Sequence, residues 1–379
     1  MIGRFPILYI AEADAEDAVL SSGVLAHLVE SLPHATFTIV GSAASAPLFA
    51  DTPRLTKLIV LEREGHFEWI ALWNQVRATK WGLVVDMRGS DLSGKLRRHK
   101  RAVRGKDQPG LHAVEAAAAV LKLEPDEIPA PKLYVSDETR AQVEALIPAT
   151  GGDGPILAVG PGVEWMGKRW PAERYAKVAA KLLADDGPLA GGRLMIVGEE
   201  IDREAAHTIR YAVPRARVIE LQGRLTRLQT VAALSTSVLY IGADSIWTQL
   251  AVASGVPVVA VFGPSDETVR GPWKGEAVRG PRTYEEFKKL DPRLNQAIQH
   301  MMDLPWERVL KAAQRMLKRC SCLPSSSGLT RGSRVPLGGG SGRSMASMRR
   351  LSRCGQSDPR VKPEDDGVKE RTPPHDPDL

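Results

Sequence analysis

Short apolar runs alternate with amphipathic stretches along the chain, which predicts strands and helices in turn. The apolar runs of the second half are nearly continuous in Val, Ile, Leu and Ala, as is typical of parallel strands buried on both faces. Right-handed βαβ crossovers then predict one doubly wound, Rossmann-like sheet in each half. Predicted strands are 6–10, 36–40, 57–61, 83–86, 156–160, 193–198, 217–221, 238–242 and 257–263, and predicted helices are 17–32, 66–79, 113–123, 172–184, 201–211, 225–234, 245–254 and 306–318.

A Gly-rich and Pro-ended segment at 149–155 is the best linker between the two halves. We therefore expect an α/β protein with an N-terminal domain at 1–150 and a C-terminal domain at 151–318, facing each other across a cleft. Residues 319–379 hold 8 Gly, 7 Pro and 10 Ser and show no apolar periodicity. Such a composition buries too little apolar surface to offset its ordering entropy, so we predict a disordered tail.

The charge and cysteine content lies unevenly along the chain. Of the formal net charge of +6, most comes from residues 319–379, which hold 11 Lys and Arg against 7 Asp and Glu. The rest of the chain is nearly neutral, which argues against a nucleic-acid partner. All 3 cysteines lie in residues 319–379, so no disulfide framework or Cys/His metal site is expected before residue 319. Without an 18-residue apolar run or a signal sequence, the protein is expected in the cytoplasm.

Polar residues follow several predicted strands of the second half, at the sheet edge where open α/β sheets bind ligands. Gly160-Pro-Gly162 comes first, followed by Lys168 and Arg169, and Gly242-Ala-Asp-Ser245 ends a later strand. Glycines let backbone N–H groups approach an anion, and a lysine supplies a positive charge. The pattern favours a phosphate site. The alternatives are that Lys168 and Arg169 are solvated loop charges and that Asp244 or Ser245 only caps the next helix.

A basic run lies in the first half of the chain. One interpretation is an ordinary solvated surface. The other is a site that captures a phosphorylated or carboxylated lipid acceptor at an anionic membrane surface. Arg88, two residues after the strand that ends at Asp86, is expected to join this site. The run comprises Lys95, Arg97, Arg98, Lys100, Arg101, Arg104 and Lys106, with no acidic residue among them.

The order and spacing of these motifs resemble the bacterial family 9 glycosyltransferases, which include the lipopolysaccharide heptosyltransferases. The resemblance covers about residues 5–318 and is more specific in the second half. In the first half it rests on Glu16-Asp17 and Asp86. The matching segments of the second half are Pro161-Gly162, Lys168-Arg-Trp-Pro171, Leu194-Met-Ile-Val-Gly198, Leu221-Gln-Gly223, Gly242-Ala-Asp-Ser245 and Phe262-Gly-Pro264.

The resemblance implies a GT-B fold and an inverting glycosyltransferase that needs no metal or other cofactor. Its C-terminal domain would bind a nucleotide-sugar donor, typically ADP-heptose, and its N-terminal domain a lipid-linked glycan acceptor, with peripheral contact to the inner membrane face. The position of Asp17 would carry the base that deprotonates the acceptor hydroxyl, and Lys168 would neutralise the departing diphosphate. The expected donor-binding residues are Gly160, Gly162, Lys168, Arg169, Glu199, Asp244, Ser245 and Gln249, and the expected acceptor-binding residues are Arg88, Arg97, Arg98 and Arg101.

The chain departs from the family pattern at both predicted sites. After Asp-Ser the family usually has Gly, often Pro, and a His five residues after the Asp; here these positions hold Ile246, Trp247 and Gln249. Near Asp17 the usual Gly is Glu16. The departures at Ile246, Trp247 and Gln249 favour one alternative, a relative that binds nucleotide or glycan without transferring sugar. A second alternative is another GT-B-like enzyme such as a nucleotide-sugar epimerase, against which the Lys168-Arg-Trp-Pro171 segment argues.

The departure at Glu16 also creates an acidic cluster, because Asp14, Glu16 and Asp17 lie within four residues. Carboxylates this close raise the pKa of one of their members. The alternative is that Asp17 only caps the helix that follows it.

Overall fold

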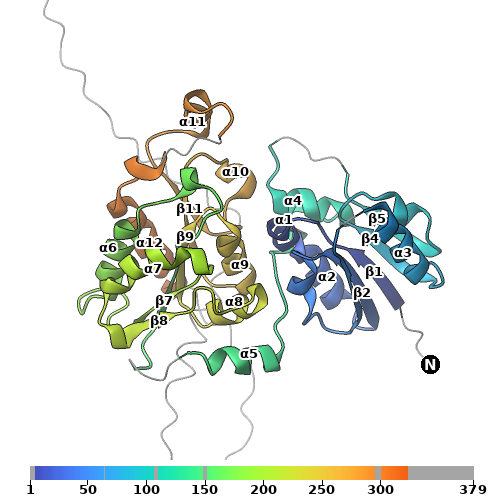
Figure 1. Ribbon diagram of the computed structural model, residues 1–379, viewed down its shortest axis with the longest axis horizontal. Coiled ribbons are helices and arrows are strands. Elements are labelled where there is room, and N and C mark those ends of the chain that lie inside the picture. Colours follow the sequence, from blue (N-terminus) through green and yellow to red (C-terminus); the bar gives the residue numbers. More distant parts are fainter. Residues whose placement is uncertain (1–4, 64, 106–109, 148–151, 295–299, 323–379) are drawn as a thin grey trace, which may run out of the picture.

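The computed structural model describes residues 5–63, 65–105, 110–147, 152–294 and 300–322. It consists of two parallel sheets, each covered by helices on both faces, which lie side by side (Figure 1). The predicted α/β fold with two doubly wound domains is confirmed. The predicted disordered tail lies outside the described residues from 323 onward, and so does the start of the predicted linker.

The N-terminal sheet has five parallel strands in the order β3-β2-β1-β4-β5. Register places Ile10 opposite both Val40 and Asp86, so the carboxyl ends of the three central strands lie at one edge. The β1 residues from Ile7 to Ile10 are fully buried, which explains their continuous apolar run. The strands are β1 (Phe5–Ile10), β2 (Ala35–Ser42), β3 (Leu55–Leu61), β4 (Trp81–Asp86) and β5 (Arg98–Val103).

Strand β5 was not predicted, because the basic run that forms it has no apolar alternation. Among the described strands it pairs with β4 alone, from Arg98 opposite Trp81 to Val103 opposite Asp86. An edge strand has one unpaired side, and charged side chains there discourage pairing with another chain. Half of the basic run therefore forms a strand, and its charged side chains are largely exposed, as the interpretation of a solvated surface expects.

The single helix expected at 17–32 is divided in two at Ser21. Within the second of these helices, Gly23 lies against the chain that leaves the domain, and a Cβ there would be 2.6 Å from the carbonyl oxygen of Pro129. A glycine is needed for this close approach. The helices of the first half are α1 (Ala15–Leu20), α2 (Ser22–Ser31), α3 (His66–Val76), α4 (Ala113–Ala118) and α5 (Asp137–Glu144).

The C-terminal sheet has six parallel strands in the order β11-β10-β9-β6-β7-β8. Gly160 lies opposite Gly242, and Ala243 opposite Val261, so β6, β9 and β10 also end at a common edge. The strands are β6 (Ile156–Gly160), β7 (Arg193–Ile196), β8 (Val218–Glu220), β9 (Leu239–Ala243), β10 (Val258–Phe262) and β11 (Glu276–Arg279), the last of which was not predicted.

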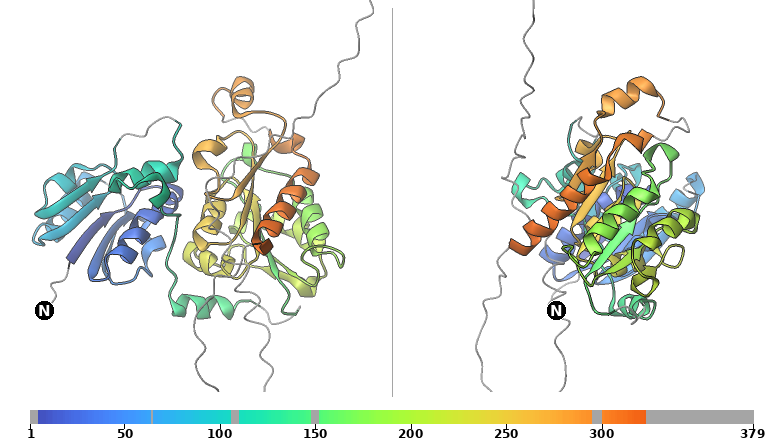
Figure 2. Two further views of the ribbon diagram at one scale, coloured as in Figure 1. Left: turned by 180° about the vertical axis from the view of Figure 1, so that it is seen from behind. Right: turned by 90° about the vertical axis from the view of Figure 1, so that its left-hand side faces the viewer.

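Helices cover both faces of this sheet, and Figure 2 shows the last of them, in orange, lying across one face. That helix, α12, ends at Cys322, four residues later than the sequence predicts, so the prediction of disorder is wrong for residues 319–322. The helices are α6 (Ala172–Leu183), α7 (Arg203–Ile209), α8 (Arg227–Leu234), α9 (Ile246–Ser254), α10 (Glu267–Arg270), α11 (Tyr284–Leu290) and α12 (Trp306–Cys322). In the part of the chain that the structure describes, no helix combines the length and the apolar character needed to cross a membrane.

Helix α5 is attached to both halves of the molecule. At its start, the N–H of Ser136 and the hydroxyl of Thr139 each donate a hydrogen bond of 2.8 Å to Oδ2 of Asp51 in the N-terminal domain. Further along, Gln142 accepts a 3.0 Å bond from Gln229 of α8, against which α5 packs. The chain thus reaches the C-terminal domain before residue 150, where the sequence predicts the boundary.

Candidate functional site

Lys168 and Asp244 meet at the carboxyl edge of the C-terminal sheet, as the motif order predicts. Lys168 ends a short 3-10 turn (Met166–Lys168) after β6, and Asp244 directly follows β9. The Nζ of Lys168 is 2.8 Å from Oδ2 of Asp244. Burial disfavours the charged lysine, but the carboxylates of Asp244, Glu16 and Glu164 together hold the pKa of Lys168 above its usual value. The hydroxyl of Ser265 donates a 2.5 Å hydrogen bond to the same oxygen.

Three buried polar atoms around the start of α9 have no hydrogen-bond partner among the described residues. They are Oδ1 of Asp244, Oγ of Ser245 and Oε1 of Gln249. Ser245 precedes the helix, but its side chain makes no capping bond, so the interpretation of Ser245 as a cap is wrong. An unpaired buried polar group costs about 1–3 kcal/mol. A polar ligand that pairs with these atoms recovers this energy.

The predicted glycines of the donor loop pack against protein side chains. A Cβ at Gly160 would overlap the hydroxyl of Tyr240, and one at Gly162 would overlap the carboxylate of Asp202. The same carboxylate accepts a 2.8 Å bond from the N–H of Glu199, which is exposed. Burial raises the pKa of Asp202, and the charge of Arg169 opposes that shift. Donor binding by Gly160, Gly162, Arg169 and Glu199 stays a prediction.

Helix α1 of the N-terminal domain faces this edge. Its cap is Asp14, whose Oδ1 accepts hydrogen bonds from the N–H of Glu16 at 2.8 Å and of Asp17 at 3.1 Å. The interpretation of Asp17 as the cap is therefore wrong. Its carboxylate instead forms an ion pair with the guanidinium of Arg270, the last residue of α10 in the other domain.

Glu16 shares the same guanidinium. Its Oε1 is 3.2 Å from Nη1 of Arg270, and its side chain is only 14% exposed. Burial raises the pKa of Glu16 to about 7, although the charge of Arg270 opposes the shift. The direction of this shift is the one that the acidic cluster predicts, but its cause is different. The main cause is burial rather than the carboxylate of Asp14.

Arg270 is a site residue that the sequence analysis missed. It lies six residues after Phe262-Gly-Pro264, and its carbonyl oxygen accepts a 2.9 Å hydrogen bond from Nε2 of Gln249. The sequence offered one signal for Arg270: it is a basic residue that follows a predicted strand at this edge of the sheet. Ile246 and Trp247, each 6% exposed, belong to an apolar core that continues into the N-terminal domain, and α9 contacts α1. These departures from the family pattern therefore contribute to packing.

The predicted acceptor residues are not gathered at one place. Arg88 lies just beyond the carboxyl end of β4, where its Nε donates a 2.6 Å bond to the carbonyl oxygen of Ala11. Arg98 lies at the opposite end of the same sheet, and Arg97 directly precedes it. Arg101 is between the two ends and donates a 3.0 Å bond to Ser93. The structure thus brings Arg88, but not Arg97 or Arg98, to the edge that faces the other domain.

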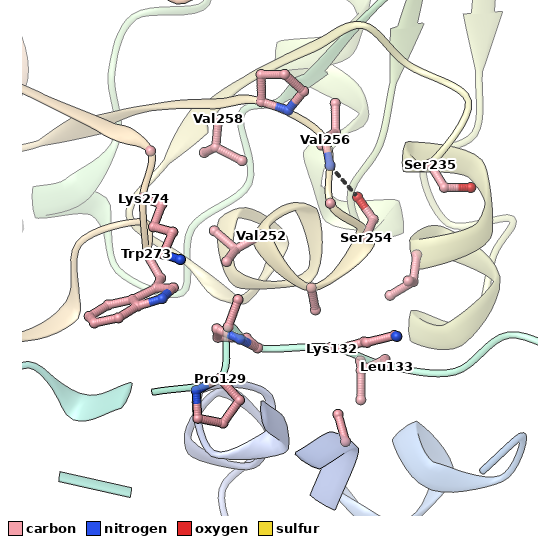
Figure 3. Close-up of a pocket in the computed structure, with 18 of the residues that line it drawn as sticks. Pro129, Lys132, Leu133, Ser235, Val252, Ser254, Val256, Val258, Trp273 and Lys274 are labelled. Atoms are coloured by element: carbon pink, nitrogen blue, oxygen red, sulfur yellow. Dashed lines mark hydrogen bonds between the residues drawn. The ribbon is translucent and has the colours of Figure 1, made fainter. Parts of the chain in front are cut away.

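A groove of about 920 Å³ lies elsewhere, between residues 128–135, which lead out of the N-terminal domain, and the amino end of β10 (Figure 3). Pro129 and Leu133 line one side, and Val252, Val256 and Val258 line the other. Val258 begins β10, whereas Asp244 lies at the carboxyl edge of the same sheet. The groove is therefore separate from the charged pairs described above.

These pairs define what the interdomain edge can bind. Among the described residues, no group of three or more His, Cys, Asp and Glu side chains is placed to hold a metal ion. The charged groups form cation–carboxylate pairs, Lys168 with Asp244 and Arg270 with Glu16 and Asp17. Cations and buried polar groups suit a phosphate ligand on one side, and carboxylates suit hydroxyl groups on the other.

Comparison with known proteins gives a consistent result in sequence and in structure. The family described as glycosyltransferase family 9 (heptosyltransferase) matches residues 67–294. The lipooligosaccharide heptosyltransferase 2 of Haemophilus influenzae is 29% identical over 161 residues, which are 40% of this chain and 45% of that protein. The chain thus spans about half the length of the curated relatives it matches.

Two solved structures share the fold over most of this chain. A family 9 glycosyl transferase from Veillonella parvula has a TM-score of 0.63 at 21% identity and covers 83% of this chain and 97% of its own. The E. coli ADP-heptose lps heptosyltransferase II has the same TM-score and identity and covers 84% and 100%. At this identity the two structures establish the fold.

Proposed function

The chain belongs to glycosyltransferase family 9, and on that premise we propose that it transfers a sugar from a nucleotide-sugar donor to a lipid-linked glycan acceptor. The proposed donor is ADP-heptose, which the name of one structural relative contains. The proposed acceptor is a growing lipopolysaccharide core or a related surface glycan, bound by the N-terminal domain. The reaction is proposed to invert the anomeric centre without a metal ion.

The observation that carries this proposal is the Lys168–Asp244 pair together with the unpaired polar atoms beside it. Lys168 is partly exposed and Asp244 is buried, so the lysine can offer its remaining N–H groups to a ligand while the carboxylate holds it in place. The free hydroxyl of Ser245 lies at the start of α9, whose N–H groups favour negative charge. This combination suits the diphosphate of a nucleotide sugar.

The proposed reaction is a single displacement. The acceptor hydroxyl oxygen forms a bond to the anomeric carbon while the bond from that carbon to the diphosphate breaks. The electron pair leaves with the nucleoside diphosphate, and Lys168 stabilises its developing charge. The hydroxyl proton passes to a carboxylate of α1. Glu16 and Asp17 both form ion pairs with Arg270 of the other domain, which supports their place opposite the proposed donor-binding loops.

We assign the base to Asp17, because its position matches the family motif and its helix is already capped by Asp14. The side chain of Asp17 is 34% exposed, which leaves it accessible to an acceptor. Glu16 is the second candidate, since a pKa of about 7 suits a general base near neutral pH.

Acceptor recognition is proposed for the carboxyl edge of the N-terminal sheet, with Arg88, just beyond β4, as one of its cations. A lipid-linked acceptor also requires that this domain approach a membrane. The exposed basic side chains of β5 favour an anionic membrane surface, to which each contributes about 1 kcal/mol.

A thermal-shift screen of nucleoside diphosphates tests donor binding, and an assay of ADP release with ADP-heptose tests transfer. We expect ADP to raise the melting temperature more than UDP or GDP, because a ligand that binds only the folded state stabilises it by mass action. Absence of any nucleotide response contradicts the proposed donor site.

The rival function is binding without transfer, which the contact of Arg270 with both candidate bases favours in this structure. A protein that binds ADP but releases none from ADP-heptose in the presence of acceptor is such a relative. Free sugar as the only product, without a glycosylated acceptor, indicates hydrolysis or epimerase-like chemistry instead.

A further inference from the structure

Arg270 connects the two domains through its side chain and its backbone. Its guanidinium reaches Glu16 and Asp17 of α1, and its carbonyl oxygen is held by Nε2 of Gln249, whose side chain is fully buried in α9. The unpaired atoms of Asp244 and Ser245 lie just before the same helix. A continuous set of contacts therefore runs from the donor-binding helix to the acidic residues of the other domain.

We propose that Arg270 is a positioning residue for sugar transfer, which holds the acidic pair Glu16 and Asp17 against the donor-binding loops. This inference rests on the function proposed above. Gln249 fixes the backbone from which Arg270 extends, so a glutamine at this position has a structural purpose of its own. The planar guanidinium offers several N–H donors in a fixed arrangement, which suits two carboxylates at once better than a lysine does.

Loss of Arg270 also changes the charge balance of the acidic pair. Its positive charge lowers the pKa of Glu16, which burial raises. Without it, Glu16 takes up a proton at a higher pH, and the negative charge beside the acceptor falls. The charged groups that face the pair are Arg270 of α10, Asp244, Lys168 and Glu164 of the donor loops, and Glu12 of the N-terminal domain.

The test compares Arg270→Gln and Arg270→Lys with the wild type. Arg315→Gln is the matched control, because Arg315 pairs with Glu276 inside the C-terminal domain and touches no residue of α1. The measurements are kcat, the ADP dissociation constant, the pH profile of kcat/KM, and hydrogen–deuterium exchange of the peptides that contain α1 and α10.

For Arg270→Gln we expect kcat to fall about 10- to 100-fold, because a misplaced base costs rate without weakening donor contacts. The ADP dissociation constant should change less than about threefold, well under the tenfold that 1.4 kcal/mol represents. The acidic limb of the pH profile should move to higher pH, and exchange at α1 should increase. Arg270→Lys should restore part of the rate and of the pH profile, and Arg315→Gln should resemble the wild type.

An Arg270→Gln variant with the wild-type rate, pH profile and exchange overturns the positioning role and leaves the proposed function intact. A wild-type protein that transfers no sugar contradicts the proposed function instead. Exchange at α1 still tests Arg270 in that case, because the measurement needs no turnover: unchanged exchange in Arg270→Gln overturns the inference.

Discussion

Lys168 and Asp244 come from loops that follow different strands, yet the amine of one lies 2.8 Å from the carboxylate of the other. The two strands, β6 and β9, are neighbours in the sheet, which brings residues 76 positions apart in sequence into contact. The pair orients the lysine toward the interdomain edge, where its charge is available to a ligand.

We expect Lys168→Ala to weaken ADP binding by roughly 1.5–3 kcal/mol, the usual worth of a hydrogen bond to a charged group. Isothermal titration calorimetry measures the change. Lys177→Ala is the control, because Lys177 is exposed on α6. Unchanged ADP affinity in a folded Lys168→Ala protein removes Lys168 from the donor site.

Asp17→Asn should lower the transfer rate by about 10²–10⁴, the usual contribution of a general base, because an amide does not accept the acceptor proton. Donor binding and the melting temperature should be nearly unchanged, since Asp14 supplies the helix cap. Steady-state turnover and ADP titration on the same preparation measure both. A rate near that of the wild type transfers the role of base to Glu16.

Asp14→Ala should reduce the free energy of unfolding by about 1 kcal/mol, because it removes the side-chain acceptor for two N–H groups of α1. Asp14→Ser should keep most of that stability, since serine also caps helices well. Urea denaturation followed by circular dichroism measures both variants. Equal losses for alanine and serine contradict a capping role.

Stability should fall between about pH 4.5 and pH 7, in part because of Glu16. Its folded-state pKa, about 7, lies above the ordinary value of 4.5, so the unfolded chain loses the proton first as pH rises. The stability contributed by the protonated form is complete below pH 4.5 and is lost as pH rises to about 7. Relative to the wild type, Glu16→Gln should gain on the order of 2–3 kcal/mol at pH 8 compared with pH 4.5. Urea denaturation of both proteins at the two pH values measures this, and equal pH dependence contradicts it.

Gly162→Ala should destabilise the protein by about 1–3 kcal/mol, because its Cβ overlaps the Asp202 carboxylate, which is held by the N–H of Glu199. Gly105→Ala is the control, since a Cβ at Gly105 meets no atom within 4 Å. Thermal unfolding compares the two. Equal melting temperatures show that Asp202 moves aside without cost.

The sequence predicts the two sheets well because their central strands are buried on both faces and carry continuous apolar runs. It fails at β5 and β11, the edge strands next to β4 and β10, because an edge strand needs no such run. The region of Ser21 and Gly23 shows a second limit of fold prediction from sequence. Just after the break between α1 and α2, Gly23 lies against the chain at Pro129, more than 100 residues later, and this contact cannot be read from the local sequence.

Some residues of the candidate site could likewise be predicted from the sequence, and others could not. Lys168 and Asp244 follow predicted strands, so topology alone brings them to one edge. Arg270 meets Asp17 only because the two domains face each other in one particular orientation, which neither strand pattern contains. For Arg98 the sequence analysis grouped residues that the structure separates. The basic run was interpreted as a single binding surface, but it extends along β5, so the two ends of the run lie at opposite edges of the sheet.

Because α5 is bonded to both domains, the boundary between them is held in different ways at the end where α5 lies and at the end where α1 meets α10. In Figure 1, α5 lies at the bottom of the molecule, and α1 and α10 lie well above it. If the domains rotate with α5 as the pivot, Gln142 and Gln229 stay together, whereas Arg270 and Asp17 move apart, because the displacement grows with the distance from the pivot. Such an opening breaks the ion pairs of Arg270, the 3.0 Å contact between Nε2 of His112 and the carbonyl oxygen of Gly271, and the packing of α1 against α9, while the far end of the boundary keeps the two domains aligned.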